Sequence, residues 1–366
     1  MKKNVIWIFL TFIFLLITLF FILPEFFVGV SYKKSEQNII VMPSIPPLDT
    51  VAYDKKLEEL ANNPPPQKPT TKIVKDPKTG EETTITIEPK TVINLWPVKT
   101  AYPNRGAILP FSRIVAYYGN LYSKQMGVLG EYPENEMLAK LDIEVKKWEE
   151  ADPYIPVIPA LHYIAVVAQD SPGADGKYRF RMPDKEIDKV LAMAEKANAI
   201  VFLDFQVGFS TIQIELPLFE KYFKLSNVHL GMDPEFSMKS GIRPGKVVGT
   251  YDAADVNFAA NYLAKIVKEN NLPPKVLVVH RYTQKMLTNY QDIKPLPQVQ
   301  IVMHMDGWGA MAQKIGTYKN FIYPEPIQFT GFKLFYKNDI KTAGTALMTP
   351  DEVLKLSPQP IYIQYQ

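Results

Sequence analysis

The sequence predicts an α/β protein built on a (β/α)8 (TIM) barrel-like domain, preceded by one N-terminal transmembrane helix and a Pro-rich tether. Three observations lead to this prediction. Residues 1–24 are dominated by apolar side chains, residues 25–103 are rich in proline, and from residue 104 onward apolar runs of strand length alternate with amphipathic stretches of helix length. A chain of 366 residues accommodates one barrel, which takes about 250 residues, together with such attachments.

The N-terminal segment Val5–Leu23 contains 19 residues without a charged side chain. Because about 20 apolar residues span a bilayer as a helix, residues 1–24 are expected to anchor the protein in the cell membrane as a single pass. Lys2 and Lys3 favour a cytoplasmic N-terminus, which places the C-terminal domain outside the cytoplasm. Secretion after signal cleavage is the alternative, although the apolar stretch exceeds the usual length and no A-x-A-like cleavage site follows it.

Residues 25–103 are expected to form an extracytoplasmic tether. Eleven of the 31 prolines fall between Pro43 and Pro103, and proline-rich chain is extended and semi-rigid. Within this segment, residues 54–62 have the composition of a short helix. Two short β-prone runs, Thr71–Val74 and Thr83–Glu88, flank a turn-like sequence and suggest a small hairpin.

The domain at residues 104–366 contains eight apolar runs that are expected to be its strands. Near-continuous apolar strands are buried on both faces, as in a parallel sheet, and their alternation with helices indicates βαβ units. The predicted strands are Ala107–Ala116, Val157–Val167, Ile200–Phe205, Val228–Met232, Val276–His280, Gln300–Met305, Gln328–Phe335 and Ile361–Tyr365.

Amphipathic stretches between these runs are expected to be helices, and their number favours a barrel. They are Glu134–Glu150, Asp184–Ala197, Ile212–Phe223, Ala253–Asn270, Gln284–Tyr290, Ala310–Tyr318 and Pro350–Leu356. An open doubly wound sheet is the alternative. It would carry a glycine-rich phosphate loop after its first strand, and the sequence Tyr117–Asn120 is not such a loop.

Composition excludes several classes of function. The net charge is only +3 and the basic residues are scattered, unlike the basic stripe of a nucleic-acid binder. The absence of cysteine excludes disulfides, thiolate metal sites and cysteine nucleophiles. Gly208-Phe209-Ser210 lacks the G-x-S-x-G pattern, which argues against a serine hydrolase. No cofactor is predicted.

Polar residues recur at the C-terminal ends of the predicted strands, where barrel enzymes carry their active sites. Asp233 and Glu235 follow the fourth strand, and paired carboxylates suit glycoside hydrolysis, in which one protonates the leaving oxygen. Crowding and apolar walls raise the pKa of one member, so Glu235 is expected to be the general acid and Asp233 to tune it. A simple cap on the turn at Pro234 is the alternative role for Asp233.

Other polar residues at strand ends complete the candidate site. Asp204 and Asp306 are expected to be supporting carboxylates, although Asp306 also suits a turn before Gly307. The expected substrate-binding residues are Tyr118, His162, Gln206, His280, Trp308 and Lys333. Of these, Trp308 offers an aromatic face on which a sugar ring can stack.

The same strand ends carry nitrogen and carboxylate donors that suit zinc, manganese or iron. These donors are His162, Asp204, Asp233, His280 and Asp306. The sequence lacks the H-x-H or H-E-x-x-H spacing that marks many metal sites, so no metal site is predicted. A metal-dependent hydrolase stays open as an alternative.

Several segments resemble those of an uncharacterised family of exported bacterial barrel proteins. They are Gly127–Tyr132, Val166–Gly176, Met232–Phe236 and Phe329–Tyr336, and the resemblance spans about residues 105–366. The family implies the barrel fold and no particular reaction. At a further remove, the acidic motif is similar to that of chitinase-like glycosidases. Their motif is a longer aspartate series that ends in the acid glutamate, and only Asp233 and Glu235 match it here.

Together these patterns lead to the hypothesis of a membrane-tethered extracytoplasmic glycoside hydrolase that acts on envelope or environmental glycans. The expected partners are a carbohydrate and, through the N-terminal helix, the membrane, with no nucleic acid. A non-catalytic glycan-binding or envelope protein with the same cleft is the second hypothesis.

Overall fold

The computed structural model describes residues 46–65, 68–75, 77–87 and 94–366. The predicted membrane segment Val5–Leu23 lies outside these residues. Among the residues that are described, no helix is both long and apolar enough to cross a membrane. The anchor and the extracytoplasmic location therefore stay predictions.

The main domain is a closed barrel of eight parallel strands. These are β3 (Arg113–Gly119), β4 (Val157–Ala168), β6 (Ile200–Phe205), β7 (Val228–Met232), β9 (Lys275–Arg281), β11 (Val299–Met305), β12 (Phe329–Leu334) and β13 (Tyr362–Tyr365). The ring closes because β3 pairs with β13 on one side and with β4 on the other. Closure confirms the predicted barrel and excludes the open sheet. A short strand, β5 (Arg179–Arg181), pairs antiparallel with the end of β4.

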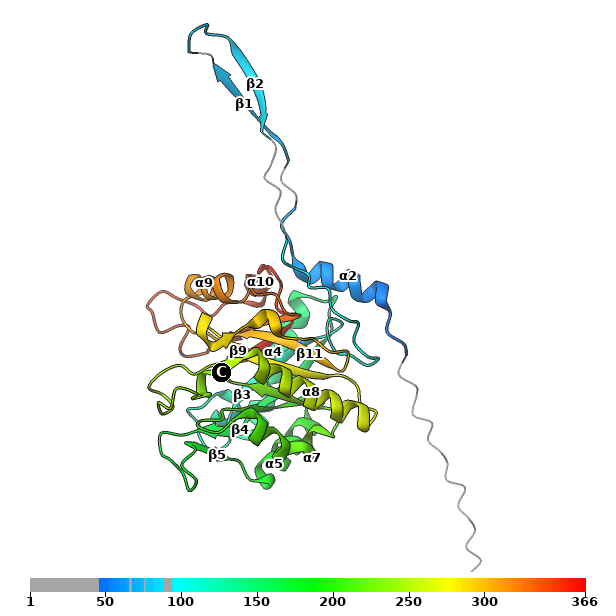
Figure 1. Ribbon diagram of the computed structural model, residues 1–366, viewed down its shortest axis with the longest axis vertical. Coiled ribbons are helices and arrows are strands. Elements are labelled where there is room, and N and C mark those ends of the chain that lie inside the picture. Colours follow the sequence, from blue (N-terminus) through cyan, green and yellow to red (C-terminus); the bar gives the residue numbers. More distant parts are fainter. Residues whose placement is uncertain (1–45, 66–67, 76, 88–93) are drawn as a thin grey trace, which may run out of the picture. The chain divides into compact units, whose positions relative to one another are not determined.

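Helices follow most of the strands and surround the barrel (Figure 1). They are α3 (Val128–Glu131), α4 (Glu134–Ala151), α5 (Asp184–Lys196), α6 (Ile212–Glu215), α7 (Glu220–Phe223), α8 (Ala253–Glu269), α9 (Met311–Phe321) and α10 (Pro350–Val353). The long ones begin as their sequences indicate. Asp252 caps α8 through a capping box with Asp255, and acidic residues occupy the first turns of α4 and α5.

Two predicted helices differ from the structure. The stretch Ile212–Phe223 is divided into α6, a 3-10 turn at Leu216–Phe219 and α7, because Pro217 lacks the N–H that a continuous helix needs. The predicted helix Gln284–Tyr290 is wrong. This segment forms a 3-10 turn and the two-residue strand β10 (Leu287–Thr288), which pairs with β8 (Tyr251–Asp252). Asn289 then adopts a left-handed conformation that no helix permits.

The first strand begins at Arg113 rather than at the predicted Ala107, and it continues to Gly119. Residues 108–112 form a turn instead, in which the Ser112 N–H donates to the Ile108 carbonyl at 3.0 Å. The side chain of Gln300 instead pairs with both backbone groups of Leu109, at 2.6 and 3.0 Å. The shift places Tyr118 inside the strand.

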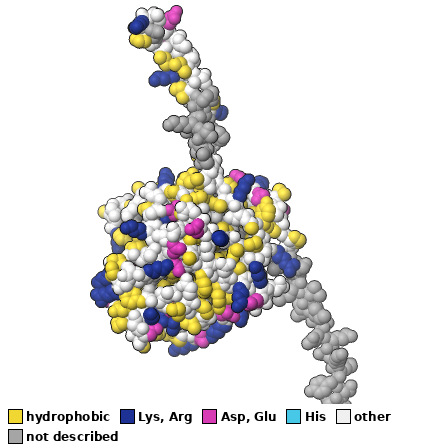
Figure 2. All heavy atoms as spheres, in the orientation of Figure 1, with side chains coloured by type: hydrophobic (Ala, Val, Ile, Leu, Met, Phe, Trp, Pro, Cys, Tyr) yellow, Lys and Arg dark blue, Asp and Glu magenta, His cyan; other side chains and the backbone are white. Residues whose placement is uncertain are grey.

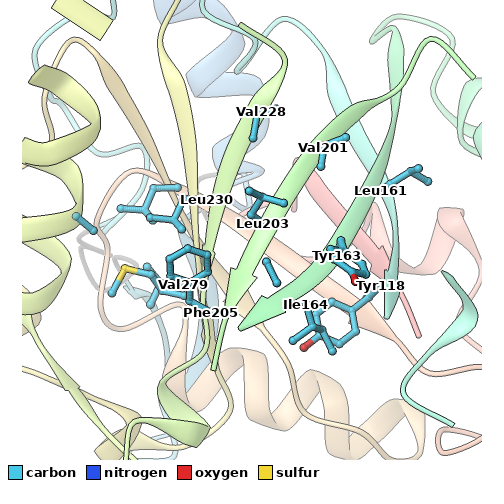
Figure 3. Close-up of a cluster of buried hydrophobic side chains, with 14 of the residues drawn as sticks. Tyr118, Leu161, Tyr163, Ile164, Val201, Leu203, Phe205, Val228, Leu230 and Val279 are labelled. Atoms are coloured by element: carbon cyan, nitrogen blue, oxygen red, sulfur yellow. The ribbon is translucent and has the colours of Figure 1, made fainter. Parts of the chain in front are cut away.

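Alternate residues of each strand face outward and inward, and the outward ones form the larger apolar core. On β6 the outward residues are Val201, Leu203 and Phe205, which pack with residues of α5 and α7. Figure 3 shows part of this core, including Leu161 on β4 and Leu230 on β7, the two strands that flank β6.

The inward residues form two layers of different chemistry. Toward the N-terminal ends of the strands the interior is mainly apolar, although it includes the buried His229 and Gln300. Its apolar cluster contains Ile114, Ala116, Ala160, Phe202, Val276, Val278, Val302 and Phe329. Toward the C-terminal ends the next inward positions are polar and buried: Tyr118, His162, Asp204, His280, His304, Lys333 and Gln364. A step of two residues along a strand, such as from Phe202 to Asp204, therefore leads from the apolar layer to the candidate site.

The N-terminal end of the barrel is covered by residues from the predicted tether. Helix α2 (Thr50–Ala61), capped by Asp49, places Tyr53 and Leu60 in the same cluster as Phe202. Trp96 is 4% exposed and donates from Nε1 to the Tyr323 carbonyl at 3.0 Å. The proline content of residues 25–103 did not predict these contacts with the barrel.

The hairpin suggested within that segment is present. Strands β1 (Thr70–Lys75) and β2 (Glu82–Ile87) pair antiparallel, and all their residues are exposed. The hairpin therefore contributes no side chain to the barrel core.

Candidate active site

A cavity of about 660 Å³ lies at the C-terminal ends of the strands. Seven residues predicted for the site line it: Tyr118, Gln206, Asp233, Glu235, Asp306, Trp308 and Lys333. The other three, His162, Asp204 and His280, are not among the lining residues and are fully buried in the barrel interior. The predicted set is thus divided between a cavity wall and a buried layer.

The pair Asp233 and Glu235 follows β7 directly. Asp233 caps the 3-10 turn Pro234–Phe236, because its Oδ1 accepts from the Glu235 backbone N–H at 3.1 Å. Its Oδ2 accepts from Gln206 Nε2 at 3.2 Å. Asp233 therefore both caps the turn, as the alternative had it, and lines the cavity. Burial, reinforced by Asp204 and Glu235 and opposed by His280, raises the pKa of Asp233 well above its ordinary value.

Glu235 is the more accessible of the two carboxyls and is partly exposed to the cavity. Burial raises its pKa, and the negative charge of Asp306 adds to this shift. A hydrogen bond with Tyr282, together with the positive charges of Lys333 and His280, opposes it. The net direction favours the protonated carboxyl, which is the form that a general acid needs.

Asp306 is held in the opposite state by its neighbours. Lys333 Nζ lies 2.9 Å from its Oδ1, and His280 Nδ1 lies 2.9 Å from its Oδ2. Burial alone would raise the pKa of Asp306, but Lys333 and His280 outweigh burial and hold the pKa below its ordinary value. The Lys333 ammonium also lies 3.8 Å from the centre of the Tyr118 ring, a cation–π contact. One cavity therefore contains a carboxyl that favours its proton and a carboxylate fixed by a cation.

The buried layer beneath the cavity joins two histidines through one aspartate. His162 Nε2 and His280 Nε2 lie 3.2 and 3.4 Å from Asp204 Oδ1. Burial lowers the pKa of His162 to about 4. Burial acts the same way on His280, but Asp204 and Asp306 outweigh it and raise the pKa of His280 to about 10. Burial raises the pKa of Asp204, yet His280 and His162 together keep it below its ordinary value.

Hydrogen bonds connect this layer to the cavity wall. Tyr118 OH donates to Asp204 Oδ2 at 3.1 Å and accepts from Gln206 Nε2 at 3.2 Å. Gln206 in turn donates to Asp233 and accepts from the backbone N–H of Ala168 at 3.1 Å. Tyr118 and Gln206 are therefore the link between Asp204 and the acidic pair.

Two loops that shape the cavity are fixed by one buried ion pair. Lys314 Nζ lies 3.0 Å from Asp339 Oδ2 and donates to the Gly307 carbonyl at 2.7 Å. Asp339 accepts from the backbone N–H groups of Gly309 and Phe335, each at 2.9 Å. These contacts hold Trp308, which is 54% exposed, at the cavity rim.

Some residues of the site were missed at the sequence level. Tyr282 lines the cavity and hydrogen-bonds to Glu235, and it follows directly after the fifth strand. The hydroxyl oxygen of Tyr362 lies 2.6 Å from His162 Nδ1. Its position two residues before Gln364 on β13 gives it the same inward direction, a signal that strand alternation provides.

Charged side chains elsewhere on the barrel are scattered, as the face drawn in Figure 2 shows. In the loops after β4 and β7, the arginine side chains are paired with carboxylates. Arg179 and Arg181 both contact Glu215, at 2.8 and 2.6 Å, and Arg243 lies 3.1 Å from Asp170. These ion pairs join the β4 loop to α6 and to the β7 loop.

No protein-family profile matches the chain, and no curated protein matches it. The resemblance to an exported bacterial family therefore stays a prediction.

Solved structures give distant matches. The cellulase Cel5C_n is 15% identical, with a TM-score of 0.37 over 70% of this chain and 75% of that one. A thermostable, halotolerant GH5 cellulase from an Icelandic hot spring isolate is 12% identical, with a TM-score of 0.38 over 81% and 82%. A GH18 chitinase from Pseudoalteromonas aurantia is 11% identical, with a TM-score of 0.34 over 70% and 94%. Similarity at these identities and TM-scores does not indicate which reaction the protein catalyses.

Proposed function

We propose that this protein is a carbohydrate-active enzyme that hydrolyses glycosidic bonds, with Glu235 as the general acid. The observation that supports the proposal is the pairing of carboxyls in one cavity. The pKa of Glu235 is raised by burial and Asp306, whereas Lys333 contacts Asp306 at 2.9 Å and keeps it a carboxylate. Two carboxyls pushed toward opposite protonation states are what acid-assisted glycoside cleavage requires.

In this mechanism Glu235 donates its proton to the glycosidic oxygen as the bond to the anomeric carbon breaks. The negative charge of Asp306 stabilises the positive charge that develops on the sugar. A water molecule supplies hydroxide to the anomeric carbon, and its proton restores the Glu235 carboxyl. Asp233 supports Glu235 by accepting from its backbone N–H. Asp204 acts through Tyr118 and through His280, which contacts Asp306.

Aromatic side chains give the cavity a surface suited to sugar rings. Trp308 is largely exposed at the rim, and Tyr282 and Phe335 line the wall. The apolar face of a sugar ring packs on such rings, while Gln313 and Lys333 offer hydrogen-bond donors for hydroxyl groups. A cavity of about 660 Å³ falls in the size range of ligand pockets.

The test is a glycan panel assayed with the full-length protein in mild detergent, with detection of new reducing ends. We expect turnover of at least one glycan by the wild type and a loss of about 10²–10⁴-fold for Glu235→Gln, the usual contribution of a general acid. Glu195→Gln, an exposed glutamate on α5, is the matched control and should retain full turnover.

Two outcomes would change the proposal. Saturable glycan binding without turnover by the wild type would support the glycan-binding hypothesis instead. Wild-type turnover by Glu235→Gln would remove Glu235 from the mechanism.

We also propose that the enzyme works outside the cytoplasm, anchored by residues 1–24, and that it acts on envelope or environmental glycans. The support is the uncharged apolar stretch Val5–Leu23. The protein should remain with membranes after washing with high salt and carbonate, because such washes remove charge-held proteins only. A soluble mature chain beginning near Tyr32 would instead indicate signal cleavage and secretion.

A further inference from the structure

Three donor atoms from different strands meet inside the barrel, below the cavity. His162 on β4 and His280 on β9 place their Nε2 atoms 3.2 and 3.4 Å from Oδ1 of Asp204 on β6. All three side chains have no exposed surface, and one ligating atom from each lies within 4.8 Å of the others. The barrel thus builds a compact set of two imidazole nitrogens and one carboxylate oxygen.

These contacts have the spacing of metal ligands and lack the geometry of hydrogen bonds. Within the part of the chain that the structure describes, none of the three atoms has a hydrogen-bond partner. Zinc bonds of about 2.0–2.1 Å in a tetrahedral arrangement place neighbouring ligand atoms about 3.3 Å apart. The two nitrogen–oxygen distances lie on either side of that value.

The remaining polar atoms of the three residues are held by outer partners. His280 Nδ1 contacts Asp306 Oδ2 at 2.9 Å, and His162 Nδ1 contacts the Tyr362 hydroxyl at 2.6 Å. Asp204 Oδ2 accepts from Tyr118 OH at 3.1 Å. Metal-binding histidines are oriented in this way, because a partner on Nδ1–H directs Nε2 toward the ion, and the ion displaces the Nε2 proton of His280 when it binds. The outer contacts therefore point all three free atoms toward one another.

The neighbouring strand leaves room beside these atoms. Gly231 on β7 faces the cluster, and a Cβ at this position would lie 2.3 Å from Asp204 Oδ1 and 2.4 Å from His162 Nε2. Any side chain here would displace the donor atoms. The absence of a side chain at residue 231 is thus required by the cluster itself.

We propose that His162, Asp204 and His280 form a binding site for one divalent transition-metal ion, zinc foremost. Imidazole nitrogen with a single carboxylate oxygen is a donor set that zinc prefers, whereas magnesium and calcium prefer oxygen ligands throughout. The site lies beneath the cavity, and Asp204 connects it to the cavity wall through Tyr118 and Gln206. The proposal is independent of glycoside hydrolysis, since its test measures bound metal.

The first experiment uses the full-length protein, produced without a histidine tag and purified without chelator. Elemental analysis is expected to find close to one equivalent of zinc or another transition metal per chain. Removal of the metal with dipicolinate should lower the thermal midpoint, and one equivalent of zinc should restore it, because an ion bound only by the folded state stabilises that state. Cobalt(II) added to the metal-free protein should give the visible absorption of a tetrahedral nitrogen and oxygen site.

Variants assign the ligands. His162→Gln and Asp204→Asn should each lose the bound metal and the cobalt spectrum. His229→Gln is the matched control, because His229 is also buried but lies near the N-terminal end of β7, where its Nδ1 accepts from the Val276 backbone N–H. This variant should keep the metal.

Less than a tenth of an equivalent of metal in the wild type, both as purified and after dialysis against zinc, would overturn the proposal. The cluster would then be an ion-free charge network. Full metal content in folded His162→Gln would likewise overturn it. If the ligand variants fail to fold, the cobalt spectrum and the zinc-dependent midpoint of the wild type still decide.

Discussion

The interior of the barrel has two halves that are built from the same strands and differ in chemistry. On β6, Phe202 belongs to the apolar layer and Asp204 to the polar layer, although only one residue separates them. On β9, Val278 and His280 show the same change. The apolar half is covered by α2, whereas the polar half lies below a cavity of about 660 Å³.

The barrel therefore places its stabilising apolar layer near the N-terminal ends of the strands and its candidate catalytic layer near the C-terminal ends. Burial of apolar surface stabilises the fold by about 25 cal/mol per Å², and the apolar half supplies such surface. Buried charges lose their hydration and are tolerated only when paired, as Asp306 is with Lys333. We therefore expect substitutions in the polar half to reduce activity and substitutions in the apolar half to reduce stability.

Of the variants that compare the two halves, Lys333→Met is expected to lose the most turnover, because it removes the cation 2.9 Å from Asp306. Glycan turnover should fall by about 10²–10³-fold, as when a fixed electrostatic partner is removed from an active site. Lys337→Met is the matched control, since this lysine is exposed and contacts Glu131 on the surface. Unchanged turnover in Lys333→Met would separate the ion pair from the reaction.

An effect on stability alone is expected at the opposite end. Trp96→Ala removes a buried indole and its hydrogen bond to Tyr323, so the free energy of unfolding should fall by about 3–5 kcal/mol. Urea denaturation measures this change. Trp308→Ala, at the exposed cavity rim, should alter stability far less. Equal losses in both variants would contradict the division between the two ends.

The smallest effect concerns pH. The pKa of Glu235 is raised and its protonated form is the active one. The turnover rate should therefore be highest below that pKa and decline as pH rises through it. Lys333 opposes the shift, so its removal should raise the pKa of Glu235 further and move the alkaline limb to higher pH. Profiles of kcat/KM against pH for the wild type and Lys333→Met check the direction, and a limb displaced to lower pH would refute it.

The sequence alone determined the fold class and the end of the barrel where polar groups gather. Apolar runs buried on both faces have a composition that few other architectures explain, and the runs Ile200–Phe205 and Val228–Met232 match β6 and β7 at both ends. Seven of the predicted site residues line one cavity because parallel strands bring their C-terminal ends to the same side.

Tertiary structure decided which of those polar residues face the cavity and which lie beneath it. Asp204 and Asp306 both end strands and look alike in sequence, yet Asp204 lies between two histidines and Asp306 contacts Lys333. Depth depends on the stagger between strands, which is set by pairing across the closed barrel rather than by any local pattern.

The local sequence likewise did not predict that α2 and Trp96 cover the N-terminal end of the barrel. Proline-rich composition predicts an extended chain, but burial of Tyr53, Leu60 and Trp96 against the barrel depends on residues more than a hundred positions away, such as Phe202 and Tyr323. Local sequence limits the conformations of a segment, whereas long-range packing selects the surface against which its apolar side chains are buried.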